Sequence, residues 1–193
     1  MNNKGFTLVE LLAMLVVLGA LMIIAIPNIT GIVGNQRLNT IRNDATTMVE
    51  TSKVKVAKDE LISKPGPGKC LVFSLSYVND NDNIELGPNG GEYDKYDSFV
   101  VYQNITTGNV TKYNYYVRLI ETKDEKHYGI ELENIKNINE ITSSNIKTNV
   151  SLIGLTEEGD NKTILSGNSE VSALCPNGIE KYYYCTESKC SFK

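Results

Sequence analysis

Lys4-Gly5-Phe6-Thr7-Leu8-Val9-Glu10 opens an apolar run that reaches Pro27. From position 6 to position 26, every side chain is apolar or small and uncharged, with Glu10 as the one exception. These 21 residues make about 31 Å of helix, which is enough to cross the hydrocarbon core of a bilayer. The run therefore predicts a helix that crosses a membrane once.

The carboxylate of Glu10 is the costly feature of this run. An acidic side chain inside a bilayer costs about 3 kcal/mol, so we expect Glu10 to have a positive partner at the same depth. Cleavage between Gly5 and Phe6 would create such a partner, because it leaves a charged α-amine on Phe6. The amine can belong to the same chain or to a neighbouring copy.

The motif from Lys4 to Glu10, continued by Leu11-Leu12, resembles the processing site of type IV prepilins and of the related type II secretion and competence pseudopilins. The resemblance implies that a membrane peptidase cuts after Gly5 and methylates the amine of Phe6. In this interpretation, Gly5 would let the backbone approach the catalytic groups of that peptidase. Glu10 would pair with the Phe6 amine of a neighbouring subunit and fix the axial step between subunits, a role in register more than in net stability.

Two further positions fit the same resemblance. Gly19 and Pro27 lie where family members carry a helix-loosening glycine and proline. A proline inside a helix removes one amide donor and costs about 3 kcal/mol, and glycine weakens the helix further. The segment between them can form a mild kink, or it can stretch or melt when subunits leave the membrane and pack into a filament.

Two other classes of segment have a similar start. A secretory signal has a shorter apolar stretch that ends in an Ala-x-Ala-like site, and no such site follows this run. A plain membrane anchor explains the length but not the Gly-Phe-Thr-Leu-Val-Glu motif. Positive charge lies at Lys4, which predicts that residues 2–5 stay in the cytoplasm and that the bulk of the chain faces outward.

The composition limits what the rest of the chain does. The 193 residues leave room for one compact domain after the apolar run. The net charge is −4, and loss of Lys4 with residues 1–5 leaves 18 basic against 23 acidic residues, or −5. The sequence has no basic stripe of the kind that binds DNA nonspecifically, so we expect no direct nucleic-acid binding.

Four cysteines are present in a domain that we expect to be exported: Cys70, Cys175, Cys185 and Cys190. An even number favours two disulfides over free buried thiols, with three possible connectivities. The spacings are too loose for a zinc site. Bridges among them would tether the carboxyl-terminal segment.

Helical spacing of apolar residues continues after Pro27, through Ile41, Ala45, Met48, Ser52 and Val56. Lys64-Pro65-Gly66-Pro67-Gly68 then stops the helix, which we expect to run from position 6 to about position 63. Residues 6–27 would be the membrane half, and residues 28–63 would be an amphipathic half packed on a sheet.

Residues 64–193 read as a β-rich head domain. Residues 71–78 alternate like a strand, although a short helix is also possible there. Residues 98–103, 110–120 and 128–132 predict an antiparallel three-stranded meander, with turns at 106–109 and 123–126. Residues 134–150 read as a helical turn or irregular, and 151–155, 163–165 and 179–185 as weaker strands. The fold class is α+β and pilin-like: a long amino-terminal helix on an antiparallel sheet, with a disulfide-tethered carboxyl-terminal region.

No catalytic site, metal site or cofactor is predicted. The single histidine, His127, has no partner in the sequence, and Gly66-Pro67-Gly68-Lys69-Cys70 follows a helix and ends in the wrong residue for a phosphate-binding loop. An acidic cluster at Asp80, Asp82 and Glu85 lacks the glycine and distal glutamate of a calcium loop and reads as solvated. Tyr182-Tyr183-Tyr184 is either an adhesive patch or, since side chains alternate along a strand, part of the packing.

Taken together, these observations predict a type IV pilin subunit, not an enzyme. It would be processed at Gly5-Phe6 and assembled with itself and other pilins into a surface filament for adhesion, motility or biofilm formation. The resemblance implies a prepilin peptidase, an assembly ATPase and an inner-membrane platform as partners. Major and minor subunits are not distinguished. The alternatives are a type II secretion or competence pseudopilin, a non-polymerising membrane-anchored binding module, and an exported hydrolase that the missing catalytic site disfavours.

Overall fold

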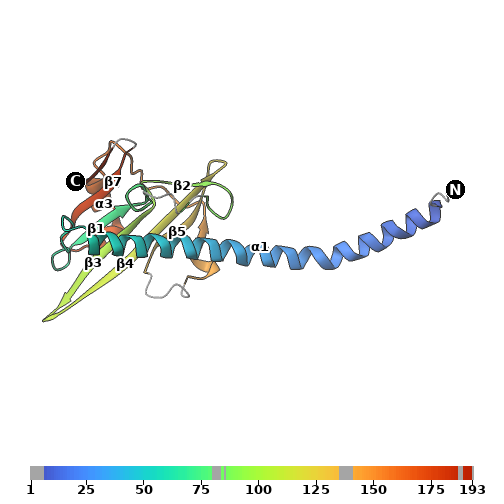
Figure 1. Cartoon of the computed structure of the whole chain (residues 1–193), viewed down its shortest axis with the longest axis horizontal. Coiled ribbons are helices and arrows are strands. Elements are labelled where there is room, and N and C mark those ends of the chain that lie inside the picture. Colours follow the sequence, from blue (N-terminus) through green and yellow to red (C-terminus); the bar gives the residue numbers. More distant parts are fainter. Residues whose placement is uncertain (1–6, 80–83, 85, 135–140, 187–188, 193) are drawn as a thin grey trace. The chain divides into compact units, whose positions relative to one another are not determined.

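The computed structural model describes residues 7–79, 84, 86–134, 141–186 and 189–192, and for residues 23–33 and 134 it describes the backbone alone. The chain is α+β (Figure 1). Its elements, in chain order, are α1 (Leu8–Lys58), β1 (Cys70–Ser74), α2 (Leu75–Val78), β2 (Glu92–Tyr93), β3 (Phe99–Thr107), β4 (Val110–Lys123), β5 (Lys126–Asn134), η2 (Ser143–Asn145), β6 (Ile146–Thr148), α3 (Asn161–Gly167), α4 (Ser169–Leu174), β7 (Ile179–Cys185) and β8 (Cys190–Phe192).

The chain divides into two compact units, Met1–Arg37 and Leu38–Lys193. The boundary lies inside α1, so the first unit carries the amino-terminal part of that helix. The second unit carries its last turns and every other element. We call the second unit the head.

Helix α1 ends at Lys58, five residues before the predicted end near position 63. Asp59 explains the earlier stop, because its carboxylate accepts a hydrogen bond from the amide of Leu61 (2.9 Å) and its carbonyl accepts one from the amide of Ile62 (3.0 Å). Such local bonds compete with the helical ladder. The resulting turn brings Ile62 into the core, where it is 5% exposed.

The head is built on one mixed sheet with the strand order β6-β5-β4-β3-β1-β7-β8, and β2 pairs with β4. The predicted meander is confirmed as β3, β4 and β5, although each strand is longer than expected. The prediction of a purely antiparallel sheet is wrong, because β7 pairs with β1 in parallel. A parallel partner needs a crossover connection, and the chain makes it through β3 to α4 before it returns beside β1.

Side chains along the central strands alternate between two cores. On β1, Leu71 and Phe73 point to one core, while Cys70 and Val72 point to the other. Tyr183 likewise faces opposite to its two neighbours on β7, as the alternation predicted. Strand β1 is therefore buried on both faces, and all five of its residues are buried.

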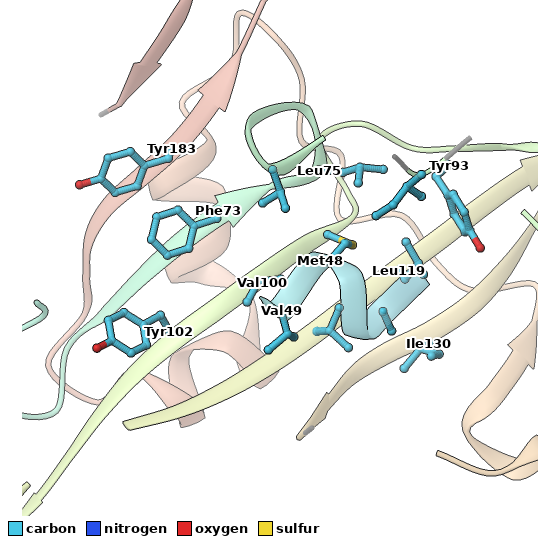
Figure 2. Packing of buried hydrophobic residues seen from close by; sticks show 14 of the residues in the cluster. Met48, Val49, Phe73, Leu75, Tyr93, Val100, Tyr102, Leu119, Ile130 and Tyr183 are labelled. Carbon is cyan, nitrogen blue, oxygen red and sulfur yellow. The ribbon is translucent and has the colours of Figure 1, made fainter. Parts of the chain in front are cut away.

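The turns of α1 within the head cover the first of these cores. The predicted positions Ile41, Ala45 and Met48 are fully buried, as is Ser52, while Val56 is half-buried. Figure 2 shows Met48 and Val49 over the strands that carry Val100 and Leu119. Ser52 loses no hydrogen bond on burial, because its hydroxyl donates to the carbonyl of Met48 (2.8 Å).

Helices α3 and α4 contribute Leu165 and Val171 to the second core. The predicted strand at 163–165 is wrong, because these residues lie in α3, where the Asp160 side chain caps the helix by accepting from Thr163 N. Residues 151–155 are irregular and not a strand. The predicted strand at 71–78 is shorter: β1 ends at Ser74, whose hydroxyl caps α2.

The sequence predicts a helical turn or irregular structure for residues 134–150. Residues 135–140 lie outside the described residues, and the part that follows contains η2 and then the strand β6, which pairs with β5. The strand was missed because it is three residues long and mostly exposed, so it carries no alternating pattern.

Candidate functional site

The amino-terminal end of α1 is held by a reciprocal pair of side chains. The Oγ1 of Thr7 accepts a hydrogen bond from the amide of Glu10 (3.3 Å), and Oε2 of Glu10 accepts from the amide (2.8 Å) and the hydroxyl (2.9 Å) of Thr7. This is the capping-box arrangement, which satisfies two amides that the first turn of a helix otherwise leaves without partners. Glu10 thus has a local role at the helix start that the sequence analysis did not assign.

The apolar residues that follow are exposed. The large hydrophobic side chains between Leu8 and Met22 are 49% to 80% exposed, and they occur on every side of the helix. Monomeric soluble proteins rarely expose a continuous apolar surface of this extent, and where one occurs it marks a contact with a protein or a membrane. This surface is the candidate functional site, and we call it the apolar segment, residues 8–22.

Some of the other predicted positions near this segment lie outside the described residues. Gly5 and Phe6 lie outside the described residues, as does the side chain of Pro27, although α1 is continuous through position 27. Gly19 lies in α1, and a Cβ placed on it would meet nothing within 4 Å. Within the described stretches of the chain, we find no helix with both the length and the apolar character of a membrane span.

The four cysteines form two disulfides, as predicted, and the structure gives their connectivity. Cys70 is bonded to Cys175 across 105 residues, and Cys185 is bonded to Cys190 across five. The first bridge is buried in the second core and joins β1 to the end of α4. The second links β7 to β8, and Cys190 is exposed. The carboxyl-terminal region is therefore tethered twice.

One buried acidic side chain, Glu121, fixes the loop at residues 87–91. Glu121 is fully buried and accepts hydrogen bonds from the amides of Asn89 (2.9 Å) and Gly91 (2.8 Å) and from Nδ2 of Asn89 (2.9 Å). A Cβ at Gly87 would lie 2.3 Å from the Glu121 carboxyl carbon. The glycines of this loop therefore let its backbone close around a buried carboxylate.

Asp44 connects α1 to the same region. Its Oδ2 accepts a hydrogen bond from the hydroxyl of Tyr93 (2.7 Å). Burial raises the pKa of Asp44, the Tyr93 hydrogen bond opposes that shift, and the nearby charge of Glu121 adds to it. Burial also raises the pKa of Tyr93, as do the hydrogen bond to Asp44 and the negative charges of Asp44 and Glu121. These groups order the contact between α1 and the sheet.

The remaining candidates give no reactive arrangement in the part of the chain that is described. His127 is the second residue of β5 and is half-buried, and its Nδ1 lies 3.0 Å from the Thr122 hydroxyl. The acidic cluster at Asp80, Asp82 and Glu85 lies outside the described residues. Across the described residues, no group of three His, Cys, Asp or Glu side chains is placed to hold a metal ion.

The sequence analysis did not identify two features of the structure, the Thr7–Glu10 capping pair and the buried Arg118. The Thr7–Glu10 pair has the Thr-x-x-Glu spacing of a capping box, a signal that the sequence did contain. A buried arginine, Arg118, lies between Val117 and Leu119 on β4. Alternation places Arg118 on the opposite face from its apolar neighbours, but nothing in the sequence indicates what surrounds it.

The chain matches no family model, no curated protein and no solved structure.

Proposed function

We propose that this chain is a type IV prepilin, cut after Gly5, N-methylated on Phe6 and polymerised into a surface filament through its apolar segment. The observation that carries the proposal is the exposure of residues 8–22 directly behind the Lys4-Gly5-Phe6 motif. The head completes two cores of its own without any residue of that segment. An apolar surface that the head does not need is left for lipid before assembly and for other subunits afterwards.

In this proposal the subunit waits in the cytoplasmic membrane, with its amino terminus inside and its head outside. The peptidase, an assembly ATPase and a membrane platform then act on it. In the filament, residues 8–22 of many copies would bury one another in a common core. The head, closed by its disulfides, would remain on the outside. A type II secretion or competence pseudopilin would use the same segment in the same way.

The capping box refines the role proposed for Glu10. A carboxylate that already accepts two hydrogen bonds from Thr7 still carries its negative charge, and acceptance from neutral groups does not neutralise it. We propose that the charge attracts the methylated Phe6 amine of a neighbour while the capping bonds orient the carboxylate. The two contributions are separable, because glutamine also forms a capping box but carries no charge.

Mass spectrometry of the chain isolated from its own cells tests the processing step. The expected product begins at Phe6 and carries one added methyl group. A chain that still begins at Met1 would contradict the proposal and favour a static anchor, and one that begins beyond Ala25 would favour a secreted domain.

Filament incorporation of three variants tests the role of Glu10. Glu10→Gln keeps the cap and removes the charge, and we expect it to block incorporation while the subunit stays in the membrane. Thr7→Ala removes the cap and keeps the charge, and we expect it to assemble. Glu50→Gln is the matched control, because Glu50 is an exposed acid of α1 that pairs with Lys53. Normal assembly of Glu10→Gln would show that the charge has no role in register.

A further inference from the structure

A second surface of the head has a cavity that the proposed filament role does not use. It has a volume of about 390 Å³ and lies between β4, β5, the irregular residues 151–153 and the junction of α3 with α4. Cavities of this size accommodate small organic ligands. Its apolar lining comes from Leu152, Ile153 and Ile164, and its charged lining from Arg118, Glu131 and Glu170.

Arg118 is the unusual member of this lining. Arg118 is 3% exposed. Within the described chain its guanidinium donates one hydrogen bond, from Nη2 to the carbonyl of Ser151 (2.5 Å). Its Nε is buried and has no hydrogen-bond partner among the residues that the structure describes. A guanidinium carries five N–H donors, and a buried charge is normally paired and fully hydrogen-bonded. The site therefore has donor capacity that the protein does not use.

The buried acid Asp97 does not use that capacity. Asp97 is 1% exposed, and its two carboxylate oxygens accept from the amides of Ile153 (3.0 Å) and Gly154 (2.9 Å). Its charge acts on Arg118 through space, and burial lowers the pKa of Arg118 while the surrounding acids raise it. Asp97 thus holds the wall of the cavity in place, and Arg118 lines the cavity without a carboxylate paired to its guanidinium among the described residues.

The two other acids of the lining limit what can bind. Glu131 forms an ion pair with Lys147, whereas Glu170 is exposed at the start of α4 and has no salt bridge in the described part of the chain. A simple anion on Arg118 would be repelled by these acids. A simple cation beside Glu170 would leave the guanidinium unpaired. A ligand with one negative and one positive group would pair with both Arg118 and Glu170.

We infer that this cavity binds a small zwitterion, an aminocarboxylate whose carboxylate accepts from Arg118 and whose ammonium group faces Glu170. A short aliphatic linker between the two charges would pack on Leu152, Ile153 and Ile164. The binding site is independent of filament assembly, since none of its residues lies in the apolar segment. It would give the head a ligand-recognition function whether or not the chain polymerises.

Calorimetric titration of the full-length chain in detergent micelles tests the inference. The probes are glycine, β-alanine and γ-aminobutyrate, which differ in linker length, together with butyrate and butylamine, which each carry one of the two charges. We expect saturable binding of at least one aminocarboxylate with a Kd below about 1 mM, and binding at least about tenfold weaker for butyrate and butylamine. Absence of saturable binding by every aminocarboxylate, or equal binding of butyrate, would overturn the inference.

Two variants locate the binding without disturbing Arg118, whose loss would leave Asp97 buried without a nearby positive charge. Gly167 lines the cavity, and a Cβ placed there meets nothing within 4 Å, so Gly167→Leu is expected to fill the cavity and abolish binding. Glu170→Gln is expected to weaken aminocarboxylate binding about tenfold. The matched controls are Ser166→Leu, an exposed position of α3 outside the lining, and Glu158→Gln, an exposed acid elsewhere. Binding that survives Gly167→Leu would exclude this cavity as the site.

Discussion

Helix α1 carries two apolar surfaces, one exposed and one buried. Between Leu8 and Met22 the large hydrophobic side chains are at least 49% exposed, whereas Ile41, Ala45 and Met48 are fully buried. The difference lies in periodicity and not in hydrophobicity. Residues 41, 45, 48 and 52 form one stripe that a single sheet can cover. The apolar segment is apolar all round, so it needs an environment that surrounds it.

This comparison separates stability from assembly. The stability of the head should depend on the buried stripe and on the contacts inside the head, and it should be insensitive to residues 8–22. Assembly should show the reverse dependence. The comparison fails if changes in the apolar segment alter unfolding of the head.

The largest stability effect is expected from the long-range disulfide of the head. Replacement of Cys70 and Cys175 by serine together opens a loop of 105 residues, and the loop-entropy relation gives a loss of about 4–5 kcal/mol in the free energy of unfolding. The same change at Cys185 and Cys190, five residues apart, should cost about 2 kcal/mol. Urea unfolding of both double variants, followed by circular dichroism, checks the order of the two losses. Equal losses would contradict the loop-entropy explanation.

A pair of methionine variants tests the comparison directly. Met48→Ala removes a fully buried side chain under the sheet and should cost about 3 kcal/mol of unfolding free energy. Met22→Ala makes the same chemical change in the same helix, at a side chain that is 60% exposed, and should leave head stability within about 0.5 kcal/mol of the wild type. A comparable loss in the two variants would show that the head depends on the apolar segment.

Much of this comparison is present in the sequence, because both surfaces are encoded locally. The stripe through Ile41 and Met48 follows helical spacing, and the meander follows alternation. Neither needs information from a distant part of the chain. The parallel pairing of β7 with β1 and the Cys70–Cys175 bond join residues more than 100 positions apart, and no local pattern specifies them. The cavity around Arg118 is assembled from four separate segments. It could not be predicted from the sequence, because no local pattern shows that these segments meet.

Local sequence patterns also give a wrong prediction where a helix-capping side chain competes with the strand propensity of the residues that follow it. Thr163-Ile164-Leu165 has the composition of a strand, yet Asp160 caps a helix over it. The end of α1 at Lys58 follows the same logic, since the Asp59 side chain takes the amide of Leu61. Side chain to backbone bonds of this kind decide boundaries, and they are weak signals beside the hydrophobic pattern.

The contact of Asp44 with Tyr93 gives a smaller, pH-dependent effect on the buried half of α1. The pKa of Asp44 is raised in the folded protein, mainly by burial, so the folded state retains this proton over a pH range in which the unfolded chain has lost it. Stability from this group is therefore greatest at low pH and falls as pH rises through the folded pKa. Asp97 shifts in the same direction, also through burial, and contributes a separate part of the slope.

Asp44→Asn should remove the Asp44 part of that slope while keeping an oxygen to accept from Tyr93. Relative to the wild type, the variant should gain stability between acidic and neutral pH, as measured by urea unfolding at several pH values. Asp44→Ala, which lacks the acceptor, should be less stable than the asparagine variant at every pH. A wild-type and an asparagine variant with parallel pH profiles would show that Asp44 titrates normally.

The smallest effect is expected at the start of α1, in the exposed half. Thr7→Ala removes the hydroxyl that accepts from the amide of Glu10 and donates to its carboxylate, a loss of about 1 kcal/mol for the first turn. The cost should remain local, because the first turn belongs to the first compact unit and the described cores of the head contain none of its residues. Amide hydrogen exchange in detergent should therefore show faster exchange at residues 8–11 and unchanged exchange in β1 and β3. Faster exchange in those central strands would mean that the two halves of α1 are coupled, and the separation of assembly from stability would have to be abandoned.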